Sequence, residues 1–140
     1  MKIPIYYIDA FADKLFSGNP AAVIFSDIDD SGLMQKIAQE NNLSETAFIR
    51  EESGAYFIRW FAPSCEIDLC GHATLASAFV YFNFINKSAD EFIVNSKTNG
   101  QLKVNVSGDL LLLDFPRDTL RNNSMHKEIL EVLGVPPIEL

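Results

Sequence analysis

Short apolar runs separated by turn residues fill most of the chain up to residue 116. Runs of β-branched and aromatic residues bounded by Gly, Pro, Asn and Asp are typical of strands. The turn Ser17-Gly18-Asn19-Pro20 precedes one run, and Pro63 ends another. Asn99-Gly100 and Gly108-Asp109 have the composition of hairpin turns. The pattern therefore predicts strands at residues 3–9, 21–25, 43–51, 55–63, 91–96, 100–108 and 110–116.

Two segments have the pattern of helices. In the first, Asp30 or Ser31 would cap a helix that places Leu33, Met34, Ile37 and Ala38 on one face. The second, residues 71–84, is apolar all round, which predicts a helix buried on every side. Together these elements predict an α+β fold in which a curved, mostly antiparallel, barrel-like sheet surrounds one central buried helix.

The pattern changes after Pro116. Residues 117–124 are polar and irregular, residues 124–135 form an amphipathic pattern with Gly134 near its end, and residues 136–140 resemble a strand start. We interpret residues 1–116 as one domain and 117–140 as a linker and the start of a second, mostly absent domain. The alternative is a terminal helix that docks on the first domain.

Composition restricts the possible partners. The chain has 140 residues, is 48% hydrophobic and 21% charged, and carries a formal net charge of −8. This charge disfavours nucleic acid and anionic membranes, which bind basic patches. The longest apolar segment is too short to span a bilayer. Cys65 and Cys70 are expected to be reduced in the cytoplasm.

The stretch "EIDLCGHATLAS", residues 66–77, places a thiol, a glycine and an imidazole at the start of the predicted central helix. The free backbone N–H groups of Gly71, His72 and Ala73 would form an anion site there. The positive helix end could lower the pKa of the Cys70 thiol from about 8.5 to near 7, as a proton carrier needs. The ordinary alternative is that Cys70 is a small buried hydrophobe.

His72 could donate to a ligand carboxylate, or it could be a satisfied structural residue. Glu66 or Asp68 could orient it, although capping or solvation of the loop is the commoner role for such acids. The spacing C-x4-C-x-H matches no standard zinc pattern, so no metal site is predicted.

Two further candidates lie earlier in the chain. Glu45, within "NNLSETAFI", sits at a strand start, where burial would raise its pKa as a general base needs. It could equally be an exposed turn acid. Asn19, in "SGNPAAV", could bind a polar group of a ligand, although such turns are common for backbone reasons alone.

Taken together, "YYIDAF", "FSGNPAAV", "NLSETAFI" and "RWFAPSCEIDLCGHATLAS" resemble the phenazine-biosynthesis PhzF-like family, which has the diaminopimelate epimerase-like fold. The resemblance implies two similar halves, each a barrel-like sheet around a helix, with an active site between them. It implies cofactor-independent proton transfer on a small substrate that carries an amine and a carboxylate. Glu45 and Cys70 would then be catalytic, whereas Asn19 and the helix start at residues 71–73 would bind substrate.

The chain departs from this family in length, because family members are about twice as long. We expect either a homodimer or a missing C-terminal half to complete the cleft, and little activity from this chain alone. The alternative function is a catalytically inactive truncated homologue that acts as a dimeric or interaction module.

Overall fold

The structure, a computed structural model, describes residues 2–117. The predicted second domain therefore lies outside the described residues, apart from Arg117. The elements are β1 (Tyr6–Ala10), β2 (Asn19–Phe25), α1 (Ser31–Asn41), β3 (Glu45–Glu52), β4 (Ala55–Phe61), β5 (Glu66–Ile67), α2 (Gly71–Val80), the π-helix η1 (Tyr81–Ile85), β6 (Glu91–Ser96), β7 (Gly100–Ser107) and β8 (Leu110–Asp114). All seven predicted strands and both predicted helices within this range are present.

The strands form one mixed sheet in the order β1-β2-β3-β4-β6-β7-β8, with the short β5 paired to β4. Most neighbours are antiparallel, as the sequence predicts. The pairs β2–β3 and β4–β6 are parallel. A parallel pair needs a crossover connection, and a helix supplies it each time. Helix α1 joins β2 to β3, and the segment containing α2 joins β4 to β6.

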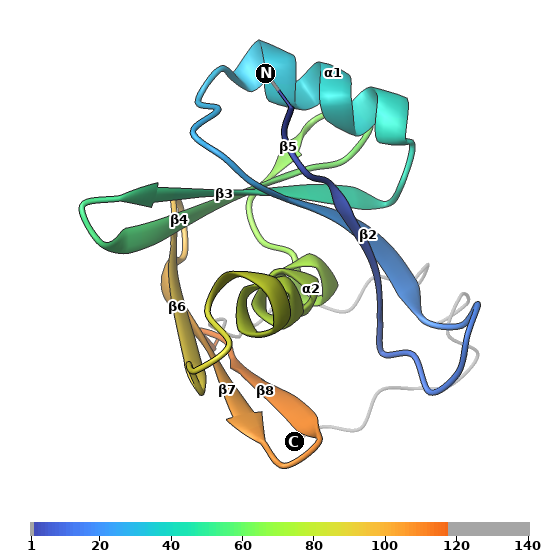
Figure 1. The fold of residues 1–140 in the computed structure, drawn as a ribbon. Helices are drawn as coiled ribbons and strands as arrows, with labels where there is room; N and C mark the ends of the chain where they lie inside the picture. The colour runs from blue at the N-terminus through green and yellow to red at the C-terminus, as the bar shows by residue number, and fades with distance from the viewer. Residues whose placement is uncertain (1, 118–140) are drawn as a thin grey trace, which may run out of the picture.

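The two helices lie on opposite faces of the sheet. The sheet curls into a half-barrel around α2, whereas α1 lies on its outer face (Figure 1). Asp30 caps α1, because its Oδ1 atom accepts the N–H of Leu33 at 2.8 Å. Helix α2 packs against β1, β2, β3 and β8, so strands distant in sequence share one helix.

This arrangement explains why β2 at residues 21–25 and β3 at residues 47–49 are apolar without interruption. Alternate residues of a strand point to opposite faces, and both faces are covered here. Val23 and Ile49 belong to the inner cluster around α2, whereas Ile24 and Phe48 belong to the outer cluster with Met34 of α1. Continuous apolar runs are expected of strands that are buried on both sides.

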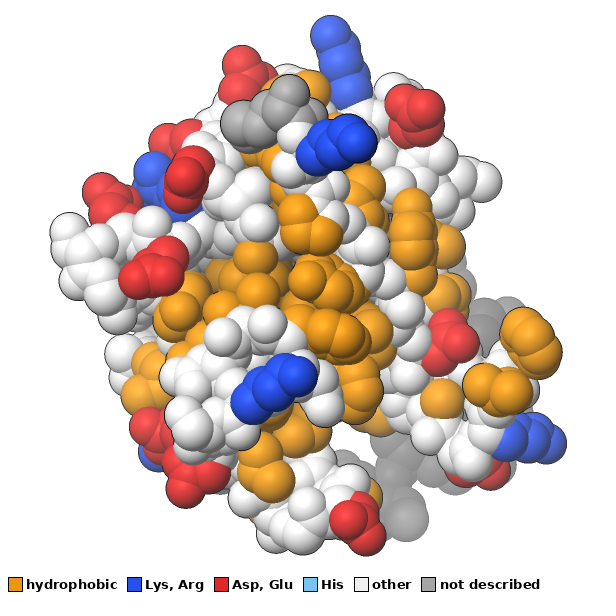
Figure 2. Space-filling view, viewed as in Figure 1, with side chains coloured by type: hydrophobic (Ala, Val, Ile, Leu, Met, Phe, Trp, Pro, Cys, Tyr) orange, Lys and Arg blue, Asp and Glu red, His pale blue; other side chains and the backbone are white. Residues whose placement is uncertain are grey.

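The sequence was wrong about two features of the central helix. The α-helix ends at Val80, and the chain continues as the π-helix η1. At the end of η1 the N–H of Asn86 donates to the carbonyl of Tyr81 at 2.7 Å. The central helix is also not buried on every side, because Phe79, Phe84 and Ile85 are exposed. Figure 2 shows hydrophobic side chains gathered in the centre of the face seen in Figure 1. Within residues 2–117 the sheet does not close between its edge strands β1 and β8, and its strands leave one side of the helix uncovered.

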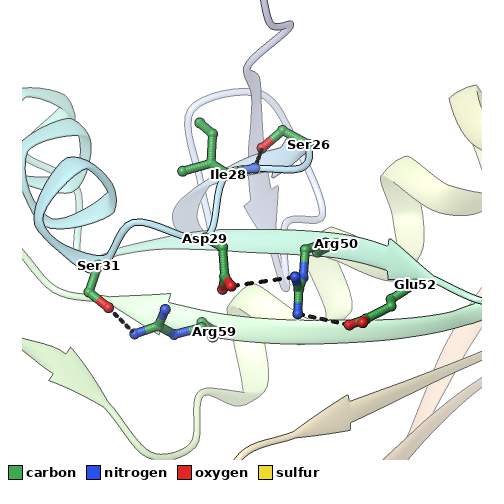
Figure 3. Close-up of polar contacts among 7 residues, drawn as sticks. All are labelled: Ser26, Ile28, Asp29, Ser31, Arg50, Glu52 and Arg59. Atoms are coloured by element: carbon green, nitrogen blue, oxygen red, sulfur yellow. Dashed lines mark hydrogen bonds and ion pairs between the residues drawn. The ribbon is translucent and has the colours of Figure 1, made fainter.

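Polar contacts tie the start of α1 to the outer face of the sheet (Figure 3). Arg59 donates to Ser31 at 2.8 Å, and Arg50 pairs with Asp29 at 3.4 Å and with Glu52 at 2.9 Å. These exposed pairs contribute little stability individually. None of the helices in the described part of the chain is long and apolar enough to cross a membrane.

Candidate active site

The start of α2 is fixed by its backbone and by Thr74. Cys70, the N-cap residue, has extended backbone (φ −141°, ψ 113°) and makes no side-chain capping hydrogen bond. Its carbonyl accepts both the N–H of Thr74 at 3.2 Å and the hydroxyl of Thr74 at 2.6 Å. The helix thus begins where the sequence places it, at Gly71, with the amide end that an anion site requires.

Glu45 is brought to this helix end by the sheet. It is the first residue of β3 and pairs with Ala21 of the parallel strand β2. Ala47, two residues further along β3, belongs to the inner cluster that contains Ala73 of α2. Since residues two apart share a face, the Glu45 side chain points to the inner side of the sheet, toward α2.

The carboxylate of Glu45 meets the imidazole of His72. Oε2 of Glu45 lies 3.1 Å from Nε2 of His72, and the two side chains are only 18% and 10% exposed. Both atoms are buried, however, and neither makes a hydrogen bond within residues 2–117. A buried polar atom without a partner costs about 1–3 kcal/mol. Such atoms are expected where a ligand completes the hydrogen bonding.

The sequence was wrong about the pKa of Cys70. Burial and the neighbouring charge of Glu45 raise the pKa of this thiol from its usual 9.0 to about 11, although the backbone amides of Ala73 and His72 act in the opposite direction. The helix end is present, but loss of water outweighs it. The Sγ atom lies 3.4 Å from Nδ1 of His72, so the protonated thiol can donate to the ring.

The aromatic ring of Phe115 packs beside the glycine at the helix start. A Cβ atom at Gly71 would lie 3.0 Å from Cε2 of Phe115, so this ring occupies the space that a side chain would fill. The sequence reasoning missed Phe115, because no local signal relates a residue after β8 to the start of α2. Phe115 itself is 38% exposed.

The remaining candidates lie in different surroundings. Asn19 begins β2 opposite Ala10, two residues before the partner of Glu45, and shares the inner face with Ala21. The side chain of Ala73 is fully buried in the core, so only its backbone could serve a ligand. The structure therefore brings Glu45, Cys70 and His72 into contact, with Asn19 further along the neighbouring strand.

The acids of the 66–77 stretch do not orient His72. Both carboxylate oxygens of Glu66 accept hydrogen bonds from Arg59 at 2.7 Å, which lowers the pKa of Glu66. The carbonyl of Asp68 accepts from Asn99 at 2.8 Å and from Thr98 at 3.2 Å. The carboxylate beside the imidazole is instead Glu45, which comes from a different strand.

Comparison with known proteins agrees with this fold. The sequence pattern of the phenazine biosynthesis-like protein family, PhzC-PhzF, matches residues 8–136. An uncharacterized isomerase of Pseudomonas aeruginosa is 44% identical over 142 residues, which cover all of this chain and 54% of that protein. A second, from Halalkalibacterium halodurans, is 41% identical over 140 residues, covering 99% of this chain and 53% of that protein. The chain therefore belongs to the phenazine biosynthesis-like family.

Solved structures show the same architecture. A PhzF family protein of Enterococcus faecalis superimposes with a TM-score of 0.84 at 44% identity, covering 97% of this chain and 52% of that one. A predicted epimerase of Pseudomonas aeruginosa has a TM-score of 0.66 at 21% identity, covering 79% of this chain and 41% of that one, and shares the fold. The chain thus spans about half the length of the relatives that it matches.

Proposed function

We propose that this chain supplies one wall of the active site of a cofactor-independent isomerase that moves a proton on a small carboxylate substrate. The contact between Glu45 and His72 at the start of α2 carries this proposal. It combines a carboxylate that can take up a proton, an imidazole that can hydrogen-bond to a substrate, and a helix end suited to an anion. Relatives named as isomerases support the reaction type.

In the proposed reaction Glu45 is the proton carrier. The substrate carboxylate is held by the amide end of α2, and the carbon beside it lies near the Glu45 carboxylate. Glu45 takes the proton from this carbon and returns it to another position of the substrate. A substrate group that hydrogen-bonds to Oε2 of Glu45 or Nε2 of His72 would satisfy atoms that lack partners.

Cys70 acts as a positioning residue in this proposal. With its pKa raised to about 11, the thiol keeps its proton near neutral pH and can donate to Nδ1 of His72, 3.4 Å away. The ring then carries its own proton on Nε2, the atom beside Glu45. The thiol would thus fix the tautomer of His72, while Glu45 carries the substrate proton.

We propose that a second wall, from either a C-terminal half or a second copy, completes the site. The relatives, about twice as long as this chain, support this proposal. Exclusion of water strengthens the electrostatic contacts on which such chemistry depends. The 140-residue chain alone is therefore expected to show little activity. We further propose that it acts in the cytoplasm, where both of its free cysteines would stay reduced.

Deuterium exchange tests this function. Small amino and hydroxy carboxylates are incubated in D2O with the chain alone, and with the chain joined to the second half of the Enterococcus faecalis relative. Glu45→Gln should slow exchange by about 10²–10⁴-fold, the usual contribution of a general acid or base. Glu40→Gln, at an exposed position of α1, is the matched control. Exchange that survives Glu45→Gln would refute this role.

A second candidate function rests on the exposed apolar side chains. Phe16 is 99% exposed, Leu15 86% and Phe11 74%, and large exposed apolar groups mark interaction sites. An interaction module would bury these side chains against a partner without turnover. Solution mass measurements of the wild-type chain and of Phe16→Ser test this. The interaction module would be favoured over the isomerase if the wild-type chain associates, Phe16→Ser abolishes this association, and no substrate shows deuterium exchange.

A further inference from the structure

We propose that Glu45, Cys70 and His72 also form a three-ligand site for a thiophilic divalent ion such as Zn²⁺. A thiolate, an imidazole and a carboxylate are ligands that zinc accepts together. The three offer ligand atoms that all lie within 4.8 Å of one another. The binding itself does not depend on the proposed isomerase function.

The spacing suits one small ion after modest adjustment. Ligand bonds to zinc are about 2.0–2.3 Å long, which places ligand atoms of a tetrahedral site roughly 3.3–3.8 Å apart. Glu45 Oε2 and His72 Nε2 are 3.1 Å apart, and Cys70 Sγ lies 3.4 Å from the other ring nitrogen. Because Oε2 and Sγ face different nitrogens of the ring, the side chains of Glu45 and His72 must rotate for all three residues to reach one ion.

Unpartnered atoms give this site a second, independent indication. The His72 side chain is 90% buried, and among the described residues neither its Nε2 atom nor Oε2 of Glu45 has a hydrogen-bond partner. An ion between them would satisfy both atoms in one step. The three residues are also fixed in advance, because Glu45 begins β3 whereas Cys70 and His72 belong to the start of α2.

Charge balance favours an ion here despite the positive end of α2. A bound ion displaces the thiol proton to solvent, so thiolate and carboxylate together contribute two negative charges. These match a divalent cation, and their proximity outweighs the partial charge of the helix end. The fourth position of a tetrahedral ion would remain for water or for a carboxylate.

The local spacing of cysteine and histidine could not reveal this site. The pattern C-x4-C-x-H suggests Cys65 as a ligand, but Cys65 is exposed and is absent from the cluster. Its place is taken by Glu45, which the pairing of β2 with β3 brings to the helix start. If Glu45 carries the substrate proton as proposed above, an ion on its carboxylate removes it from the reaction.

Cobalt titration tests the site directly, since Co²⁺ replaces Zn²⁺ and reports a thiolate ligand by its charge-transfer absorption. Wild-type chain is compared with a background variant in which the other cysteine and the other histidine, Cys65 and His126, are replaced by Ser and Gln. We expect one-to-one binding with a thiolate band in both, and competition by Zn²⁺. In this background Glu45→Gln, Cys70→Ser and His72→Asn should each weaken binding by more than the about 10- to 100-fold that loss of an outer-shell partner costs, because each removes a ligand.

Glu40→Gln is the matched control and should leave binding unchanged. Circular dichroism checks that each variant is folded, and Cys70→Ala replaces Cys70→Ser if the hydroxyl destabilises the core. Absence of saturable one-to-one binding, absence of the thiolate band, or unchanged affinity in the Glu45 or Cys70 variant would overturn the proposal. Because the readout is metal binding, failure of the isomerase assay would leave this result standing.

Discussion

The Nε2 atom of His72 lies 3.1 Å from Oε2 of Glu45, although one residue belongs to a helix and the other to a strand. Neither atom has a hydrogen-bond partner in the part of the chain that the structure describes. Buried polar groups without such a partner are costly. The surrounding packing of α2 against β2 and β3 keeps them there, and both proposals for the site follow from this arrangement.

Alkylation of Cys70 should show the raised pKa. In Cys65→Ser, the rate of reaction with iodoacetamide should keep rising with pH until about 11, because burial raises the pKa of the thiol from 9.0 to about 11. The unfolded variant in denaturant is the control and should level off near the usual value. At pH 7 the folded thiolate should be about 100-fold scarcer than the unfolded one. An inflection below 9 would contradict this prediction.

The same pKa difference has a consequence for stability. Between pH 9 and about 11 the folded thiol keeps a proton that the unfolded chain has lost, so the free energy of unfolding falls as pH rises through this window. Below pH 9 both states are protonated and no such dependence is expected. Denaturant titrations of wild type and Cys70→Ser should therefore differ in slope with pH only in the alkaline range.

Gly71 and Phe115 should be energetically coupled. Gly71→Ala places a Cβ atom 3.0 Å from the ring of Phe115, and the ring must move to accept it. We expect Gly71→Ala to lower the free energy of unfolding by about 1 kcal/mol more in the wild-type background than in the Phe115→Ala background, as for other overpacked contacts. Equal effects of Gly71→Ala in the two backgrounds, measured by urea unfolding, would show that the ring does not restrict this position.

Gly18 lies in the turn before β2, and Gly54, in the turn between β3 and β4, is its matched control. Both have left-handed backbone, with φ of +90° and +81°, but a Cβ atom at Gly18 would lie 2.5 Å from the carbonyl of Ala10, whereas one at Gly54 meets nothing within 4 Å. Gly54→Ala should cost about 1–2 kcal/mol, the penalty of the backbone conformation alone. Gly18→Ala should cost about 3 kcal/mol or more. Similar losses of thermal stability would show that the turn rearranges.

The pair of Arg59 and Glu66 should contribute to stability above mildly acidic pH. Hydrogen bonds from Arg59 lower the pKa of Glu66 from its usual 4.5, so this contribution is present above pH 4.5 and is lost as pH falls through the lowered value. Both side chains are partly exposed, which limits the effect to roughly 0.5–1 kcal/mol. Glu66→Gln should therefore reduce the acid dependence of unfolding. An unchanged acid limb would contradict this assignment.

The amino-acid sequence determined the elements of this protein and the start of its central helix. Periodicity and turn residues carry that information, since they act over a few neighbouring residues. The helix start at Gly71 follows from local patterns, as do a cap at either Asp30 or Ser31 and a strand over residues 43–51; the structure has the cap at Asp30 and the strand from Glu45. The π-helical end of the central helix did not, because apolar residues continue past Val80 on both sides of Asn83 and no local signal marks the change of helix type.

Only the tertiary structure decided which of these residues meet. The parallel pairing of β2 with β3 and the packing of α2 on the inner face set Glu45 beside His72, and no local pattern contains that contact. The same packing removes water from Cys70, which reverses the pKa shift expected from the helix end. Burial depends on everything that surrounds a side chain, whereas the sequence displays only its neighbours along the chain.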